Sequence, residues 1–158
     1  MSKSTPRLAS GIALWFGVGK LPKAPGTWGS LAALPFAWVI IEATGAPLSL
    51  LLAAFVLLPI GVWASALHSE RTNTHDSGEI VVDEVAGQWI ALAVAPLSPL
   101  GWVLAFVLFR FFDIIKPWPI SWIDQRVTGG WGIMLDDIVA GLFAAVCIWM
   151  LMAFVGGF

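Results

Sequence analysis

Long apolar runs alternate along the chain with short turns and polar connections. Apolar residues dominate five segments, which span 28–43, 48–67, 85–95, 100–115 and 138–154. A helix of about 20 apolar residues is long enough to cross the hydrocarbon core of a membrane. The pattern therefore predicts an all-α, multihelical integral membrane bundle, with residues 1–158 forming a single domain. A shorter apolar run over 8–16 predicts a helix that lies in the membrane interface, with Trp15 as its anchor.

The composition supports the same class of protein. Of the 158 residues, 59% are hydrophobic and only 11% are charged, whereas a soluble domain carries about 25% charged residues. The formal net charge of −2 is small, so it indicates no strongly charged partner, and no nucleic-acid partner is expected. The surroundings that the composition predicts are those of a lipid bilayer.

The few charges are distributed unevenly between the two sides that the predicted helices define. If every apolar segment crosses, residues 1–30, 68–84 and 110–137 face one side, and all eight Lys and Arg residues lie there. Nine of the ten acidic residues lie on the same side, with Glu42 as the exception. Because cytoplasmic loops carry the excess of Lys and Arg, we expect this side to be cytoplasmic and to hold the chemistry. The two shortest apolar segments are also compatible with a buried hairpin that crosses only part of the membrane.

Two pairs of adjacent acids stand where apolar segments begin. Asp83-Glu84 and Asp136-Asp137 are each followed closely by an Ala-Gly pair. Small residues let membrane helices approach closely, which would bring four carboxylates together, and such charges repel unless protons or cations neutralise them. Oxygen ligands with room for water suit Mg²⁺, so the sequence predicts a metal site formed by Asp83, Glu84, Asp136 and Asp137. Two alternatives stay open: acids that complement the helix dipole, and a proton or cation pathway.

A second group of charges lies at the end of the segment 100–115. Arg110, Asp113 and Lys116 are spaced by three, so they share one face of a helix. They form either a self-contained ladder of ion pairs or an anion clamp. In the clamp, Arg110 and Lys116 bind phosphate, and Asp113 orients them or joins the metal shell.

Two further groups are candidates for the same site. Gly26 and Thr27 enter a predicted helix, where backbone N–H groups favour an anion such as a phosphate; a plain N-cap has the same pattern. His75, with Asp76, lies eight residues before the first acid pair. It is a candidate general acid or base, and the alternative is an ordinary solvated histidine.

Four motifs follow one another along most of the chain. They are Pro25-Gly26-Thr27 with Gly29-Ser30-Leu31, then Ile80-Val81-Val82-Asp83-Glu84, then Phe109-Arg110 with Lys116-Pro117-Trp118-Pro119-Ile120, and finally the run 129–141 that ends in Asp136-Asp137-Ile138-Val139-Ala140-Gly141. Together they resemble the phosphatidylglycerophosphatase A family. The resemblance implies a Mg²⁺-dependent phosphatase with several crossings of the bacterial inner membrane. It further implies conversion of the membrane phospholipid phosphatidylglycerophosphate to phosphatidylglycerol at the cytoplasmic face, and a central helix starting near Asp83.

The resemblance and the residue pattern together give the candidate roles. The candidate catalytic residues are Asp83, Asp113, His75 and Asp136, and the candidate phosphate-binding residues are Arg110, Lys116, Gly26 and Thr27. The attacking group stays open between a metal-activated water and a carboxylate. The competing hypothesis is a transport subunit that uses the acid pairs as a proton or cation relay. Such a protein is expected to carry charges near the membrane midplane, whereas here they gather at one face.

Overall fold

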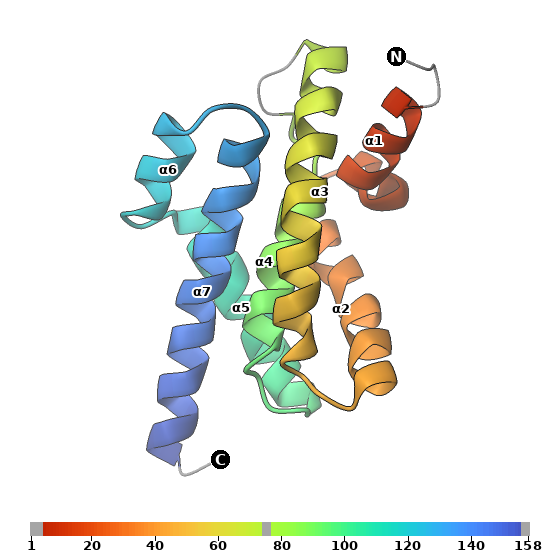
Figure 1. Ribbon diagram of the computed structural model, residues 1–158. Helices are drawn as coiled ribbons and strands as arrows, with labels where there is room; N and C mark the ends of the chain where they lie inside the picture. Colours follow the sequence, from red (N-terminus) through yellow and green to blue (C-terminus); the bar gives the residue numbers. More distant parts are fainter. Residues whose placement is uncertain (1–4, 74–76, 156–158) are drawn as a thin grey trace.

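The structure is a computed structural model that describes residues 5–73 and 77–155. Every regular element in this part of the chain is a helix, so the all-α prediction is confirmed. In chain order (Figure 1), the elements are α1 (Thr5–Ala13), the 3-10 helix η1 (Trp15–Lys20), α2 (Pro25–Thr44), α3 (Ser49–Thr72), α4 (Val82–Leu92), α5 (Pro99–Ile115), α6 (Ile120–Arg126) and α7 (Gly129–Val155).

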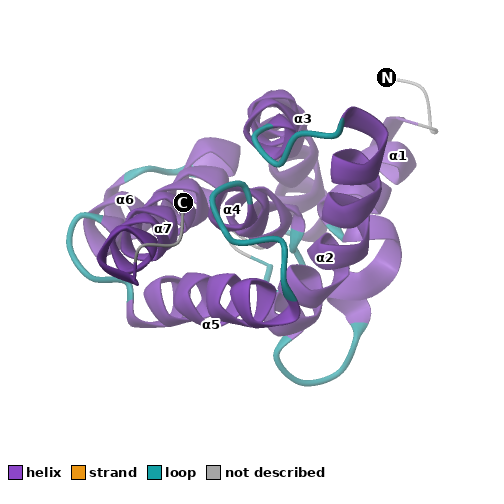
Figure 2. Cartoon of the chain, turned by 90° about the horizontal axis from the view of Figure 1, so that it is seen from below, coloured by secondary structure: helices purple, strands orange, loops and turns teal. Residues whose placement is uncertain are grey.

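Helix α4 lies at the centre of the bundle, which confirms the expectation of a central helix starting near Asp83. Figures 1 and 2 show α2, α3, α5 and α7 arranged around it. Nine of its eleven residues are buried, and the two that are not are Asp83 and Glu84. A helix that is apolar on every side is stable only when other elements enclose it. With 11 residues, α4 is also too short to cross the membrane by itself.

Small residues let α4 and α7 approach until their backbones touch. A Cβ atom added to Gly87 would lie 2.5 Å from the carbonyl oxygen of Asp137, and one added to Gly141 would lie 2.4 Å from the carbonyl oxygen of Gly87. Any side chain at either glycine would therefore overlap the neighbouring backbone. Because residues four apart lie on one side of a helix, this contact places Asp83 beside Asp137, each one turn before its glycine.

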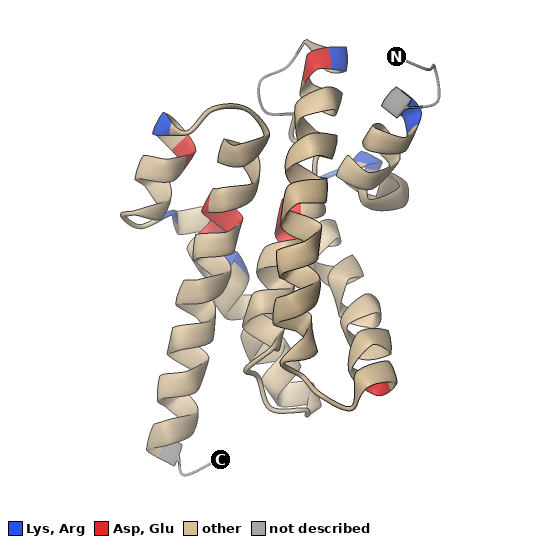
Figure 3. Ribbon diagram, viewed as in Figure 1, with Lys and Arg blue, Asp and Glu red and all other residues tan. Residues whose placement is uncertain are grey.

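Among the residues that the structure describes, three helices, α2, α3 and α7, are long and apolar enough to cross a membrane. The bundle exposes large apolar side chains on them, among them Trp38, Phe55 and Phe154, as a protein surrounded by lipid must. The prediction of a membrane protein is confirmed at this level. Figure 3 shows the charged positions gathered toward the end of the bundle that holds the C-terminal end of α3 and the start of α7. Glu42 is the exception, because it lies near the opposite end, in the last turn of α2.

The glycine-rich stretch after α6 is helical, so the last helix begins well before the apolar segment 138–154 that predicts it. Helix α7 begins at Gly129, so Asp136 and Asp137 lie in its third turn and not at its N-terminal end. The glycines here serve close packing: a Cβ atom on Gly130 would lie 2.1 Å from the carbonyl oxygen of Val62 in α3. The helix-dipole alternative therefore does not apply to the second acid pair.

Trp15 is a core residue, and its prediction as an interfacial anchor is wrong. Helix α1 ends at Ala13, and the chain then turns back because Trp15 and Phe16 adopt positive φ values of 43° and 59°. Trp15 is only 6% exposed. Its ring centroid lies 5.0 Å from that of Phe36 and 5.8 Å from that of Trp89. Edge-on aromatic contacts of this kind stabilise a core.

Replacing Gly87 or Gly141 by alanine tests the contact between α4 and α7. We expect each substitution to lower the melting temperature of the detergent-solubilised protein, because the added methyl group overlaps backbone. Overpacking of this kind costs about 1–3 kcal/mol. The matched control is Gly11→Ala in α1, where a Cβ atom would meet nothing within 4 Å. If circular dichroism gave the same melting temperature for the three variants, the contact would not be the constraint described here.

Candidate active site

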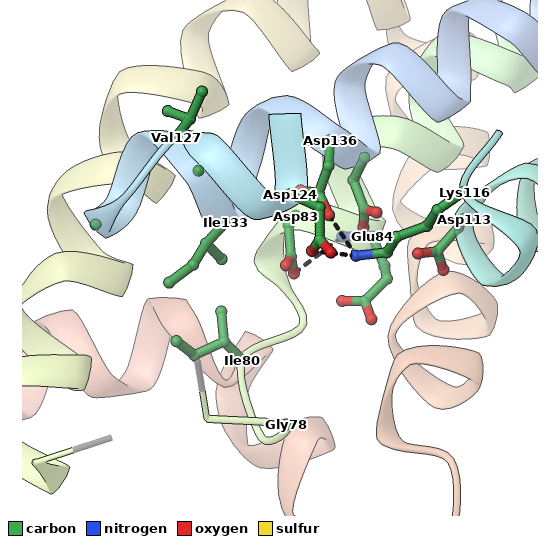
Figure 4. Close-up of a pocket in the computed structure, with 13 residues that line it drawn as sticks. Gly78, Ile80, Asp83, Glu84, Asp113, Lys116, Asp124, Val127, Ile133 and Asp136 are labelled. Carbon is green, nitrogen blue, oxygen red and sulfur yellow. Dashed lines mark hydrogen bonds and ion pairs between the residues drawn. The ribbon is translucent and has the colours of Figure 1, made fainter. Parts of the chain in front are cut away.

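A polar cavity opens where α4, α5, α6 and α7 meet, and Figure 4 shows its side chains converging. Its volume is about 170 Å³, enough for several water molecules. The charged side chains that line it are Asp83, Glu84, Asp113, Lys116, Asp124, Asp136 and Asp137, and the rest of the wall is Gly78, Ile80, Val127, Gly129, Gly132 and Ile133. Six of the seven charged residues are acids, so the cavity is strongly negative.

Three carboxylates form the innermost group of the cavity. Asp83, Glu84 and Asp137 each offer an oxygen, and these oxygens lie within 4.8 Å of one another. The first turn of α4 supplies two of them and the third turn of α7 supplies the other, so the two acid pairs meet as the sequence analysis expected. Carboxylates at this separation repel one another unless a proton or a cation lies between them.

Burial shifts the protonation of the two acids on α4. Burial raises the pKa of Asp83 well above its usual range, and the neighbouring charge of Glu84 adds to the shift. Burial likewise raises the pKa of Glu84 to about 8; Asp137 and Asp113 add to this shift, and Arg110 opposes it. Within the described residues, Oε2 of Glu84 is buried without a hydrogen-bond partner. A buried charge without a partner is costly, so these acids are neutralised at neutral pH either by protons or by a cation.

Asp136 lies beside this group and interacts with Lys116. Its Oδ2 accepts a hydrogen bond from Nζ of Lys116 at 2.7 Å. Its Oδ1 is buried and has no hydrogen-bond partner among the residues that the structure describes. Of the four metal ligands predicted from the sequence, Asp136 is thus the one that forms an ion pair with a lysine, and it lies outside the group of three carboxylates.

Lys116 connects α6 and α7 through Asp124, a residue that the sequence analysis missed. Nζ of Lys116 also donates to Oδ1 of Asp124 at 2.6 Å. Burial alone would lower the pKa of Lys116, but the hydrogen bonds that it donates to Asp124 and Asp136 outweigh this effect and raise that pKa. The sequence pattern gave Asp124 no role because it belongs to neither acid pair and to none of the four motifs. The available signal was an acid eight residues after Lys116 in a chain with only ten acids in all.

Arg110 lies behind the cavity wall, on the side of Glu84 and Asp113. It pairs with Asp113 one turn later and lies 3.9 Å from Oε1 of Glu84. Of the expected ladder, the ion pair between Arg110 and Asp113 forms. Lys116 does not continue it, because it ends α5 with a left-handed φ of 46° and pairs with other acids. A Cβ atom on Gly26 would lie 2.1 Å from Oε1 of Glu84 and 3.1 Å from Arg110. The start of α2 therefore packs directly against this pair.

Three of the described sequence candidates, Gly26, Thr27 and Arg110, do not line the cavity themselves. Thr27 is half-buried and does not line it. His75 lies outside the described residues, together with Asp76, so the proposed acid–base role of His75 stays a prediction. The described continuation of the same segment does reach the site, because Gly78 and Ile80 line the cavity.

The fold and the site define a helical membrane protein whose buried carboxylates and basic residues suit a phosphate group beside a cation. The chain belongs to the phosphatidylglycerophosphatase A family, whose model matches residues 11–152. The resemblance noted from the sequence motifs is thereby confirmed. The protein is a phosphatase.

Relatives with assigned names cover most of the chain. It is 46% identical over 136 residues to the phosphatidylglycerophosphatase A of Escherichia coli K12, covering 85% of this chain and 77% of the relative. It is 39% identical over 146 residues to that of Haemophilus influenzae, covering 89% of each. A putative phosphatidylinositol-3-phosphatase of Bacteroides thetaiotaomicron is 37% identical over 145 residues, covering 87% of this chain and 89% of the relative. No solved structure matches the chain.

Substituting Asp124 by asparagine tests its part in placing Lys116. With one carboxylate removed, the ammonium group is drawn inward to Asp136, so we expect the KM for a phosphorylated lipid to rise more than kcat falls. Hydrogen bonds to charged groups are worth enough to give a rise of about tenfold. Asp124→Glu should restore much of the loss, and Arg126→Gln on the same helix serves as the control. An unchanged KM in Asp124→Asn would remove Asp124 from the site.

Proposed function

We propose that this phosphatase removes the terminal phosphate of phosphatidylglycerophosphate, giving phosphatidylglycerol and inorganic phosphate. The observation that carries the proposal is the meeting of Asp83, Glu84 and Asp137 within 4.8 Å in one cavity with Lys116. The names of the Escherichia coli and Haemophilus influenzae relatives supply the substrate. A phosphomonoester carries negative charge, so it requires both a cation and basic side chains in so acidic a cavity.

Mg²⁺ is the cofactor that we propose for the three innermost carboxylates. Their oxygens are hard ligands, Oε2 of Glu84 lacks a partner within the described chain, and the cavity leaves room for coordinated water. Mg²⁺ is bound by this type of donor set, with a few carboxylates and several waters. A bound Mg²⁺ supplies positive charge that polarises a phosphoryl oxygen and lowers the pKa of a bound water.

Basic residues on two sides of the cavity bind the phosphate in this proposal. Lys116 uses two of its three N–H donors on Asp124 and Asp136, which leaves the third for a phosphoryl oxygen. Arg110 offsets charge on the side of Glu84. The backbone amide of Gly26 adds to this side, because the start of α2 packs against Glu84 and Arg110 there. The amide of Thr27 donates to the carbonyl oxygen of Ala24 at 3.0 Å, so it is not free for the phosphate.

Carboxylates that do not hold the cation move the proton. Water attacks phosphorus, the bond between phosphorus and the glycerol oxygen breaks, and that oxygen leaves with a proton as the alcohol of phosphatidylglycerol. Asp136 can accept the proton of the attacking water on Oδ1, because Lys116 occupies only Oδ2. Asp113 or His75 is the group that protonates the leaving oxygen.

The cytoplasmic face of the bacterial inner membrane is the place that we propose for this reaction. The eight Lys and Arg residues all lie in the segments that flank the site, as the positive-inside rule requires of a cytoplasmic surface. The substrate then enters from the lipid bilayer, and the protein crosses the membrane several times.

A second phosphorylated lipid is an alternative candidate for the substrate. One relative is named as a putative phosphatidylinositol-3-phosphatase, which favours another phosphomonoester on a lipid headgroup. The transport hypothesis has no such support, because the relatives named above are phosphatases by name. The same cavity would serve either lipid, so the choice is one of headgroup shape.

Phosphate release from the two lipids decides between the substrates. The purified protein is incubated with phosphatidylglycerophosphate or with phosphatidylinositol 3-phosphate in mixed micelles, and free phosphate is measured. We expect kcat/KM to be at least about tenfold higher for phosphatidylglycerophosphate, a difference of about 1.4 kcal/mol in transition-state binding. A preference for the inositol lipid would contradict the proposed substrate but not the phosphatase activity.

Removing single carboxylates tests the proposed cation site. Asp83→Asn, Glu84→Gln and Asp137→Asn should each lower phosphate release by about 100-fold or more, above the loss typical of outer-shell partners of a metal. EDTA should abolish activity, and Mg²⁺ should restore it. Glu70→Gln, an exposed acid on α3, serves as the control. Full activity in EDTA would contradict the proposed dependence on Mg²⁺.

Binding of Mn²⁺, followed by electron paramagnetic resonance, tests the same site without turnover. The intact protein should bind Mn²⁺ and release it when Mg²⁺ is added, because both ions prefer oxygen ligands. Glu84→Gln should weaken the binding by about 10-fold or more. Equal binding by Glu84→Gln and Glu70→Gln would move the cation away from the three carboxylates.

A further inference from the structure

A groove lies at the end of the bundle opposite the candidate active site, between the C-terminal end of α2 and the start of α5. Its volume is about 390 Å³. Its walls are formed by Trp38, Ile41 and Glu42 of α2 and by Leu97, Ser98, Pro99 and Trp102 of the turn before α5 and its first residues. All but two of these residues are apolar, so a single carboxylate stands in an apolar surface.

Glu42 is out of place in this surface. It is the only charged residue in 31–66, 85–109 and 138–158, the segments that build this end of the bundle. Within the described residues, no Lys, Arg or His pairs with it. It also lies in the last turn of α2, where the partial negative charge of the helix end disfavours an acid. Glu42 therefore brings no interaction that stabilises the fold.

Two tryptophans flank the same groove. Trp38 lies one turn before Glu42 on α2 and is 61% exposed, and half-buried Trp102 lies on the facing wall. The face of an indole ring attracts a cation, and tryptophan is the strongest of the aromatic side chains in this respect. A carboxylate that shares one groove with two such rings is suited to an alkylammonium group.

We propose that this groove binds the ammonium end of a phospholipid headgroup of the ethanolamine type. Helix α2 is long and apolar enough to span the membrane, so its last turn lies at the level where lipid headgroups and interfacial tryptophans meet. A second copy of the chain in the same orientation has no Lys or Arg at this level. A bilayer supplies the ammonium headgroup at high local concentration, and the apolar walls accept the adjoining glycerol and acyl carbons.

Lipid retention measures the proposal directly. The full-length protein is reconstituted in vesicles of equal parts phosphatidylethanolamine and phosphatidylglycerol, extracted in mild detergent, and its bound lipids are weighed by native mass spectrometry. We expect phosphatidylethanolamine to be enriched roughly two- to fivefold over phosphatidylglycerol among the bound lipids, as an exposed cation–π contact allows. Glu42→Gln and Trp102→Leu should each abolish the enrichment, and Glu42→Asp should keep part of it.

A matched control separates this groove from the general lipid surface. Trp149 is an exposed tryptophan that lines a different groove, with Pro47 and Leu48, so Trp149→Leu should leave the enrichment unchanged. Glu42→Gln should keep the melting temperature and the phosphatase activity, because Glu42 lies outside the candidate active site. Soluble phosphoethanolamine should fail to displace the lipid, since it lacks the apolar part.

Three results would overturn the proposal. These are equal retention of the two lipids by the unaltered protein, an enrichment that survives Glu42→Gln, and an equal loss in Trp149→Leu. None of them measures phosphate release. Phosphatidylglycerol bound at the active site as the proposed product is common to the unaltered protein and Glu42→Gln, so the difference between these two is independent of the proposed function.

Discussion

The backbone contact between α4 and α7 fixes the dimensions of the site. Gly87 and Gly141 touch the opposite backbone, and one turn away the same two helices carry Asp83 and Asp137. Without the glycines, the helices would stand apart by at least the width of a side chain. The carboxylates would then be too far apart to share one cation. The close packing of α4 and α7 thus determines how near the carboxylates of Asp83 and Asp137 lie to each other.

The repulsion between the acids of the cavity destabilises the fold, and the basic residues offset this repulsion only in part. Six acids line the cavity with one lysine, and Arg110 adds one more positive charge behind them. Burying carboxylates costs free energy unless each has a partner. Lys116 and Arg110 satisfy the outer acids, Asp113, Asp124 and Asp136. Among the innermost acids of the described chain, Glu84 has only Arg110 at 3.9 Å, and Asp83 and Asp137 have no basic partner. Their charge is what the proposed cation would neutralise.

Apolar periodicity and the repeated acid–small-residue pattern were enough to predict the helical membrane class and the meeting of the two acid pairs. The start of α7 was not predictable, because glycines at 129, 130 and 132 are typical of a loop unless α3 is known to pack against them. Trp15 was misplaced for a similar reason, since its burial depends on a reversal of the chain. Asp124 became visible only when α6 brought it back to Lys116. The first two failures concern contacts between segments far apart in the sequence, and the third concerns a turn that brings together two residues eight positions apart.

The enclosure of α4 has a consequence for how the protein enters the membrane. At 11 residues, α4 is about 16 Å long, so it is too short for stable insertion as an independent span. Its packing surface on α7 is synthesised some fifty residues later, about the length of two membrane spans. Until α7 is synthesised, Asp83 and Glu84 lack the third carboxylate of their group, Asp137. They would then face lipid or remain outside it. We therefore expect α4 to insert late, together with α7, so that the acidic centre is assembled in the final step of biogenesis.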